Sequence, residues 1–342
     1  MKNNEKIKNS NIKEIKYLFD VTENAFTYSG LDNSFAVFKT INNLLYLIYS
    51  NEFNSIICIN LENLQKVSEM KNCHKSHIGN FIFYSDIKSR RDLMLSISCN
   101  DLHIKLWNIN NFECLLNIKN LYSKGRLLSA CFINGNNNIY IATCHYDIVW
   151  VDNSGLINIL DLNGKIIKKI NKSNEMSFYI DSFYDKNKLI NFILTGNKNY
   201  VKSYNYDKNI LYHKYYDLGN EYIHSNILIY DKKDIIKLIE TCYDGNLRIW
   251  DFHSGFLINK IKISDDNIRG LCLWNEEYLL VGCFDKTIKL VELNNDNYNI
   301  INLIKSDDEL ITIKKINHPL YGECLLTQGS HFSQIKIWGF KD

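Results

Sequence analysis

A sequence pattern in the stretch Ile239–Lys262, IETCYDGNLRIWDFHSGFLINKIK, recurs along most of this 342-residue chain and constrains its fold more than any other feature. Three short segments alternate between apolar and polar residues, as half-buried strands do: Ile239–Cys242, Leu247–Asp251 and Phe256–Ile261. The sequences between them include YDGN and HSG, which are rich in residues that favour tight turns. The stretch therefore predicts three strands of a small antiparallel sheet.

Alignment on Trp250 finds the same pattern at six other places, each with an apolar or aromatic residue at the Trp position. Neighbouring copies lie 41 to 53 residues apart. A repeat of about 40–45 residues with four strands is typical of a blade in a β-propeller. One such sheet cannot bury both faces alone, so the copies must pack face to face around an axis. We therefore predict an all-β, seven-bladed propeller with anchors at Ile59, Trp107, Leu160, Tyr204, Trp250, Val291 and Trp338.

Three of the repeats carry a further mark, an Asp six residues before the anchor, in DLHIKLWN (101–108), DGNLRIWD (244–251) and DKTIKLVE (285–292). With these motifs the chain resembles the WD40-repeat β-propellers, and the resemblance covers nearly its whole length. It is strongest in blades two, five and six, intermediate in blade seven, and rests mainly on spacing in blades one, three and four. The Asp position holds Lys198 in blade four and Phe332 in blade seven.

The N-terminal region offers a strand that the last repeat lacks. Residues 1–10 predict a disordered basic tail, because they are polar and rich in lysine. Residues 11–20, NIKEIKYLFD, alternate as a strand does, whereas the four residues after Trp338 are too few for an outer strand. We expect residues 11–20 to complete the last blade and close the ring, which resembles how WD40 propellers commonly close. Residues 11–342 are then one propeller domain.

Charge and hydropathy argue against several classes of partner and location. The formal net charge of +2 gives no bulk electrostatic reason to bind nucleic acid or an anionic membrane. The longest apolar run near the start, Leu44–Tyr49, is far shorter than the roughly 20 residues of a membrane-spanning helix. The polar N-terminus also lacks the apolar core of a signal peptide. We expect no membrane span, no secretion, and no affinity for nucleic acid.

The ten cysteines occupy repeat positions. Cys99, Cys242 and Cys283 each precede the turn Asp of a different blade by two residues, and Cys144 lies on the corresponding strand of blade three. Equivalent positions in separate blades are expected to lie farther apart than the Cα limit of about 7 Å for a disulfide. We therefore expect reduced thiols buried in strands, and hence a cytoplasmic protein, with the nucleus as the alternative compartment.

The resemblance to WD40 repeats also implies a hydrogen-bonded network that pins each blade through a His before the first strand, the turn Asp and the strand Trp. In blade two these are His74, Asp101 and Trp107, with Cys99 at a position where Ser or Thr is common. The expected role is structural, because a buried carboxylate requires hydrogen-bond donors. The corresponding residues in the other strong repeats are Asp244 and Trp250 in blade five and Asp285 in blade six.

Neither a metal site nor an enzyme motif follows from the sequence. Cys73, His74 and His77 form a C-H-x-x-H cluster, but a structural zinc site needs a second pair of ligands at suitable spacing, and none is near. The chain has no G-x-S-x-G, no phosphate-binding Gly-rich loop and no H-E-x-x-H. We expect no metal, no cofactor and no catalytic residue. The alternative is a propeller enzyme with its active site on the axis, because fold alone does not settle function.

Arg90 and Arg91 are similar to the double-arginine motif with which one propeller subfamily binds phosphoinositides. That motif has an apolar residue before the arginines and Gly after them, whereas this chain has Ser89 and Asp92. We expect a solvated loop here, since an adjacent acid would oppose an anionic headgroup. Phosphoinositide or nucleic-acid binding is a further alternative function.

Aromatic and arginine residues are expected at one face of the ring, where the segments entering each blade meet the turns between second and third strands. In WD40 propellers the residue before the turn Asp points to this face. Such side chains are enriched in interface hot spots, and packing between blades is their alternative role. We predict a non-catalytic WD40 scaffold or adaptor, a subunit of a multiprotein complex, that binds proteins or peptides through this rim. The expected rim residues are Arg126, Trp150, Tyr243, Arg269, Phe284 and His331.

Overall fold

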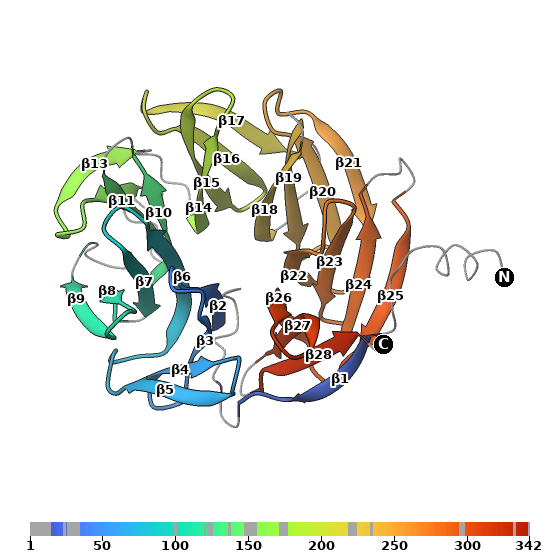
Figure 1. The fold of residues 1–342 in the computed structure, drawn as a ribbon. Helices are drawn as coiled ribbons and strands as arrows, with labels where there is room; N and C mark the ends of the chain where they lie inside the picture. The colour runs from blue at the N-terminus through green and yellow to red at the C-terminus, as the bar shows by residue number, and fades with distance from the viewer. Residues whose placement is uncertain are drawn as a thin grey trace.

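The structure, a computed structural model, is a ring of seven four-stranded antiparallel sheets, so the predicted all-β, seven-bladed propeller is confirmed (Figure 1). It describes residues 15–22, 25, 35–98, 101–119, 121, 126–135, 138–146, 156–170, 177–217, 224–232, 235–293, 298–330 and 333–340. The elements assigned in these ranges are all strands. No helix long and apolar enough to cross a membrane occurs in this part of the chain.

Each blade is a meander whose strands follow one another from the axis outward. Blade one contains β2 (Phe35–Lys39), β3 (Leu45–Ser50), β4 (Ile56–Asn60) and β5 (Gln65–Met70). Blade two contains β6 (Ile78–Asp86), β7 (Arg91–Ser98), β8 (His103–Asn108) and β9 (Glu113–Ile118). Blade three contains β10 (Arg126–Asn134), β11 (Ile139–Tyr146), β12 (Ile157–Leu160) and β13 (Ile166–Ile170). Blade four contains β14 (Ser177–Asp185), β15 (Ile190–Asn197), β16 (Tyr200–Asn205) and β17 (Ile210–Tyr216).

The remaining three blades follow the same order. Blade five contains β18 (His224–Lys232), β19 (Ile235–Cys242), β20 (Asn246–Asp251) and β21 (Leu257–Lys262). Blade six contains β22 (Ile268–Leu273), β23 (Tyr278–Cys283), β24 (Thr287–Glu292) and β25 (Ile300–Lys305). Blade seven contains β26 (Leu310–His318), β27 (Gly322–Gly329), β28 (Lys336–Phe340) and, from the start of the chain, β1 (Ile15–Asp20).

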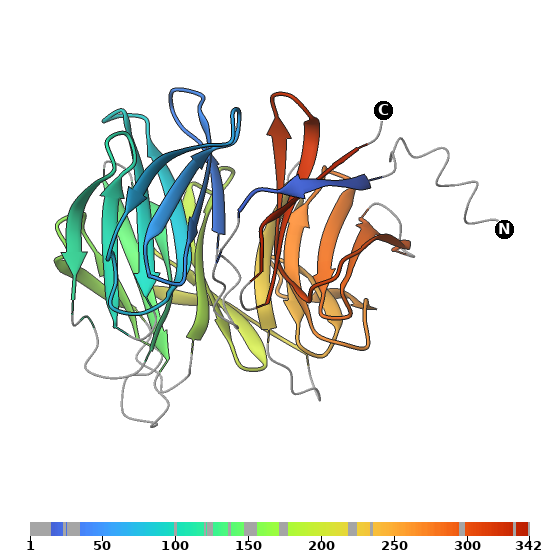
Figure 2. The same ribbon diagram turned by 90° about the horizontal axis from the view of Figure 1, so that it is seen from below.

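The N-terminal strand closes the ring, as the sequence predicts. β1 pairs antiparallel with β28, with Tyr17 opposite Trp338 and Asp20 opposite Lys336. Figure 2 shows β1 lying beside the last strand of the chain, at the junction between the first and last blades. Residues 11–14 of the expected strand and the expected tail at 1–10 lie outside the described residues.

The core consists of seven hydrophobic clusters, each shared by two neighbouring blades. The cluster between blades six and seven, for example, contains Leu280 and Leu290 from one side and Leu325 and Trp338 from the other. Second strands are buried almost throughout, as in β7, whereas fourth strands such as β9 are mainly exposed. The apolar faces of the blades therefore meet each other, which is why the separate repeats form one continuous ring.

One sequence interpretation is wrong. The arginine pair was expected in a solvated loop with Asp92, but β7 already begins at Arg91, and Asp92 is 1% exposed. The Asp92 carboxylate accepts hydrogen bonds from the backbone N–H of Ile41 in blade one and from the Ser85 hydroxyl. This acid therefore joins two blades, a role that requires burial. Of the two arginines, only Arg90 lies in the exposed turn before β7.

Candidate functional site

In blade two the predicted network residues lie in one chain of polar contacts. The Trp107 indole N–H donates to Ser96 Oγ over 2.9 Å, and Ser96 Oγ lies 2.8 Å from His74 Nε2. His74 Nδ1 is 3.4 Å from Asp101 Oδ2. Because an ionised Asp101 can only accept, we assign the imidazole proton to Nδ1, and Nε2 then accepts from the Ser96 hydroxyl.

Asp101 is held as an anion by this arrangement. Burial raises its pKa, but the His74 contact and the backbone N–H groups of Lys75 and His103 outweigh burial and lower the pKa of the carboxyl to about 2. These groups fix the segment before β6 against the turn between β7 and β8. The network is therefore a structural clamp within blade two.

The hydroxyl of this network was missed in the sequence. The position considered for it, Cys99, lies outside the described residues, and Ser96 supplies the oxygen. The same rule holds in the other blades whose anchor is Trp: Glu240 Oε1 accepts the Trp250 indole at 3.0 Å, and Thr327 Oγ1 accepts the Trp338 indole at 2.9 Å. An oxygen-bearing residue ten or eleven positions before the Trp is the signal that identifies the acceptor.

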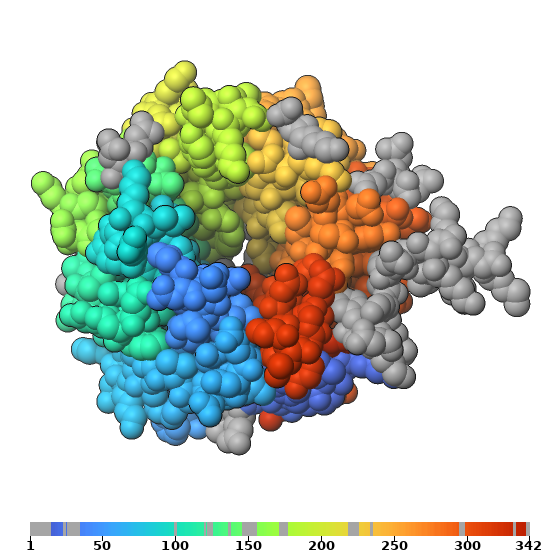
Figure 3. Space-filling view, viewed as in Figure 1, coloured from blue at the N-terminus to red at the C-terminus, as the bar shows by residue number. Residues whose placement is uncertain are grey.

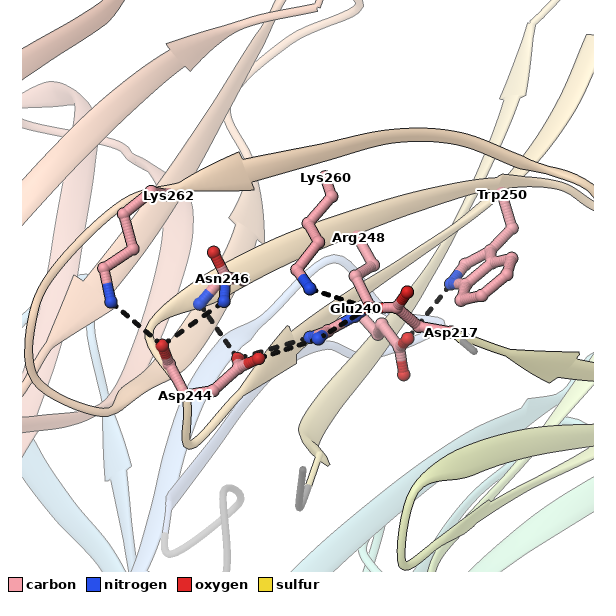
Figure 4. A network of polar contacts seen from close by, with 8 residues as sticks. All are labelled: Asp217, Glu240, Asp244, Asn246, Arg248, Trp250, Lys260 and Lys262. Carbon is pink, nitrogen blue, oxygen red and sulfur yellow. Dashed lines mark hydrogen bonds and ion pairs between the residues drawn. The ribbon is translucent and has the colours of Figure 1, made fainter. Parts of the chain in front are cut away.

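In blade five the corresponding network is built from ion pairs between side chains and is shown in Figure 4. Arg248, whose side chain is 0% exposed, lies between two carboxylates. It donates to Asp217 through Nε at 3.0 Å and to Asp244 through both terminal nitrogens at 3.2 and 2.7 Å. Lys260 Nζ also reaches Asp217, at 2.8 Å. Arg248 thereby joins the segment after β17 to the turn between β19 and β20.

These carboxylates are stabilised in the charged form. Burial raises the pKa of both, but hydrogen bonds from Lys260 and Arg248 to Asp217, and from Arg248 to Asp244, outweigh it, and both pKa values lie below the ordinary range. In blade six, Asp285 accepts from Ser264 and Lys289 in a similar way. The predicted residues Asp244, Trp250 and Asp285 therefore hold strands and turns in place, and the structure shows no further chemistry for them.

The first strand of six blades contains a register shift near its start, and in blade six this shift lies between Ile268 and Gly270. A β-bulge of this kind redirects the side chain of the extra residue. In blade six the extra residue is Arg269. The side chain therefore leaves the regular alternation of β22 and turns towards the turns of blades five and six.

Arg269 lies between two aromatic rings at this rim. Its guanidinium carbon is 4.6 Å from the centre of the Tyr243 ring and 4.7 Å from the centre of the Phe284 ring. Tyr243 belongs to the turn between β19 and β20, and Phe284 to the turn between β23 and β24, and both rings are half-buried. The structure thus brings together three of the six rim residues predicted from the sequence. Cation–π contacts of this kind contribute about 0.5–2 kcal/mol each.

The other three predicted rim residues are not part of this sandwich. Arg126 begins β10 in blade three, where it is half-exposed. Trp150 and His331 lie outside the described residues. Of the described rim residues, the structure therefore brings together the three from blades five and six.

The axis of the ring holds a cavity of about 480 Å³ lined by residues of all seven first strands. Figure 3 shows the opening at the centre of the molecule. One wall carries Asp181, which accepts hydrogen bonds from the Tyr179 hydroxyl at 3.1 Å and the Ser182 N–H at 2.7 Å. Burial in this channel raises the pKa of Asp181 despite those bonds and the charge of Lys314. The sequence offered no signal for this carboxylate.

No group of three or more potential metal ligands occurs within the described ranges. In the C-H-x-x-H cluster, the Cys73 thiol donates to the Met70 carbonyl and His74 belongs to the blade-two network. These contacts engage both side chains in holding the local structure.

Comparison of the sequence with models of protein families and with curated proteins finds no match.

Proposed function

We propose that this propeller is a divergent WD40-repeat protein that acts as a non-catalytic protein-interaction platform, a scaffold or adaptor subunit of a larger complex. The observation that carries the proposal is the Tyr243–Arg269–Phe284 sandwich at the rim. Tyr and Arg are among the residues most enriched in interface hot spots, and Phe is enriched in interfaces. Here Tyr243 and Phe284 lie on turns and Arg269 lies on β22, and the ring of blades holds all three in place.

The rigidity of the ring supports binding by this surface. Each turn is fixed by paired strands on both sides, and neighbouring blades share a continuous core. A partner that docks on such a surface orders few protein groups on binding, so less conformational entropy opposes association. The function needs no catalytic group and no cofactor.

Two observations support the WD40 assignment. The order of contacts in blade two, Trp107 to Ser96 to His74 to Asp101, contains the residues that the resemblance implies. The first and last strands of the chain share a blade, which resembles the closure of that family.

The nine cysteines in the described ranges are free thiols, which supports a reducing compartment such as the cytoplasm or nucleus.

The proposal is tested by capturing partners from extracts of cells that make the protein. Tagged wild type is compared with Arg269→Ala, Phe284→Ala and the control Arg90→Ala, whose arginine lies in the exposed turn between β6 and β7. A hot-spot truncation costs about 2 kcal/mol or more, which corresponds to roughly 30-fold in Kd. We expect a partner of the wild type and of the control to be lost from both rim variants, while thermal midpoints stay close to that of the wild type.

Two outcomes contradict the proposed site. If the rim variants retain every partner, the sandwich is not the interface. If Phe284→Ala instead lowers the free energy of unfolding by about 3–5 kcal/mol, as removal of a buried Phe does, Phe284 is a packing residue.

A second candidate is a small-molecule or catalytic site on the axis, favoured by Asp181 in the central cavity. A ligand or substrate there would be recognised by the carboxyl group and enclosed by a channel wall that carries both polar and apolar residues. A metabolite screen by thermal midpoint tests this. Compounds that stabilise the wild type but not Asp181→Asn support an axial site, and the absence of any such compound argues against it.

A further inference from the structure

We infer that Arg269 is the receptor for a single oxyanion, a carboxylate or a phosphate group, carried by the peptide that docks on the rim. This inference rests on the proposed function and adds the chemistry of the partner. It follows from the donors of Arg269, from the geometry of the two rings, and from the charges around them.

The guanidinium has donors without acceptors. Arg269 is 7% exposed, and its Nε and Nη1 atoms are buried with no hydrogen-bond partner. No carboxylate forms an ion pair with it among the described residues. A buried donor left unpaired destabilises the protein, and more so when it is charged. A ligand that supplies acceptors to these N–H groups therefore recovers free energy that the unbound rim lacks.

The two rings determine where an acceptor can lie. Tyr243 and Phe284 each lie over the guanidinium at stacking distance. The in-plane edge carries the N–H groups, so a ligand must approach in the plane of the guanidinium. Carboxylates and phosphates match that edge with two parallel hydrogen bonds. Both rings are half-buried and the donors are buried, so binding requires one ring to move aside.

Neighbouring acids do not neutralise Arg269. Asp244, next to Tyr243, is engaged by the Arg248 fork, and Asp285, next to Phe284, is engaged by Ser264 and Lys289. Because Arg248 and Lys289 pair with these acids, the charge of Arg269 remains available to one oxyanion of the ligand.

The test uses inorganic phosphate and acetate as probes on the full chain, with ionic strength held constant by sodium chloride. The variants are Arg269→Gln, which removes the charge, and Arg269→Lys, which keeps the charge but loses the planar fork. Arg126→Gln is the matched control. The readouts are the thermal midpoint and the side-chain Nε–Hε NMR signals, which come from five arginines and are therefore few.

We expect phosphate, acetate or both to shift the Arg269 Nε–Hε signal of the wild type in a saturable way and to raise its thermal midpoint. The signal is assigned by its absence from Arg269→Lys. Both variants at 269 should lose the rise in midpoint, and Arg126→Gln should retain it. A response to acetate alone identifies a carboxylate, and a response to phosphate alone identifies a phosphate group.

An unmoved Arg269 signal overturns the inference even if a variant fails to fold, because that readout uses the wild type. An equal midpoint response in the wild type and in Arg269→Gln overturns it as well. If Arg269→Ala loses the captured partner but the wild type shows no anion response, the rim is still the interface and only the oxyanion inference is refuted. Retention of the partner together with an anion response shows that the site binds anions and refutes the proposed function.

Discussion

Replacement of Arg248 by Met is expected to destabilise the propeller by about 3–5 kcal/mol, the usual cost of removing one partner from a buried ion pair. Met has a similar length and restores most of the apolar contacts, so the loss is mainly electrostatic. The side chain of Arg248 is 0% exposed, whereas those of Asp217 and Asp244 are 11% and 26% exposed. Both carboxylates would remain largely withdrawn from water, Asp244 without the Arg248 cation and Asp217 with Lys260 alone.

The pH dependence of the stability of the same variant is a second test of this ion pair. The pKa values of Asp217 and Asp244 are lowered in the folded protein, so the folded state binds fewer protons than the unfolded chain in acid. Their contribution to stability is complete above the unfolded pKa of about 3.9 and is lost as the pH falls through the folded values. Arg248→Met raises those folded values, so acid should cost the variant less additional stability than it costs the wild type.

Urea unfolding at pH 7 and at several values down to pH 3 measures both effects. Lys262→Met is the matched control, because Lys262 lies on the next strand, is 52% exposed and, within the described ranges, reaches only the Asp244 carbonyl and the exposed Asp265. Its loss should be within about 1 kcal/mol, as for most surface charges. The pair Arg248→Met and Asp217→Asn should be less destabilised than the sum of the single variants, since an amide needs no cation.

A loss for Arg248→Met no larger than that of Lys262→Met would refute the reasoning. An unchanged dependence on pH would also count against it, because it would mean that Arg248 does not set the pKa values of its neighbours.

Three further predictions concern closure, thiols and a histidine. Deletion of residues 1–20 removes β1 and should leave a chain that aggregates, whereas deletion of residues 1–9 should behave as wild type; a stable, monomeric product of the longer deletion would contradict closure by this strand. All ten cysteines should titrate as free thiols in denaturant. In the folded protein the exposed Cys114 should react first, because burial raises the pKa of Cys58 and of Cys144 to about 12. One stoichiometric disulfide found by mass spectrometry would overturn the first expectation. Burial and the Lys188 charge lower the pKa of His253, so the folded state favours the neutral imidazole. Stability should therefore fall as the pH drops below about 6.5, and less steeply in His253→Gln. Equal slopes of stability against pH for the two proteins would exclude His253 as the cause.

Much of the fold follows from local features of the sequence. The alternation of Leu247–Asp251, the turn sequence YDGN before it and the spacing of the anchors specify strands, turns and repeats without reference to distant residues. The closing strand was predictable for a related reason, because the last repeat is visibly one strand short. Even Tyr243 and Phe284 could be assigned to the rim, since their place relative to the turn Asp is a property of the repeat.

The contacts that give the blades and the rim their chemistry depend on tertiary structure. Ser96 meets His74 across 22 positions, and Arg248 meets Asp217 across 31, so neither pair is visible in a local pattern. Asp92 looked like a loop residue because its partner Ile41 belongs to another blade. Arg269 was expected at the rim from the sequence, but its place beside two rings from neighbouring blades depends on the bulge in β22. Local sequence specifies backbone conformation and periodicity, but the burial of a charge is decided only when separate blades enclose it.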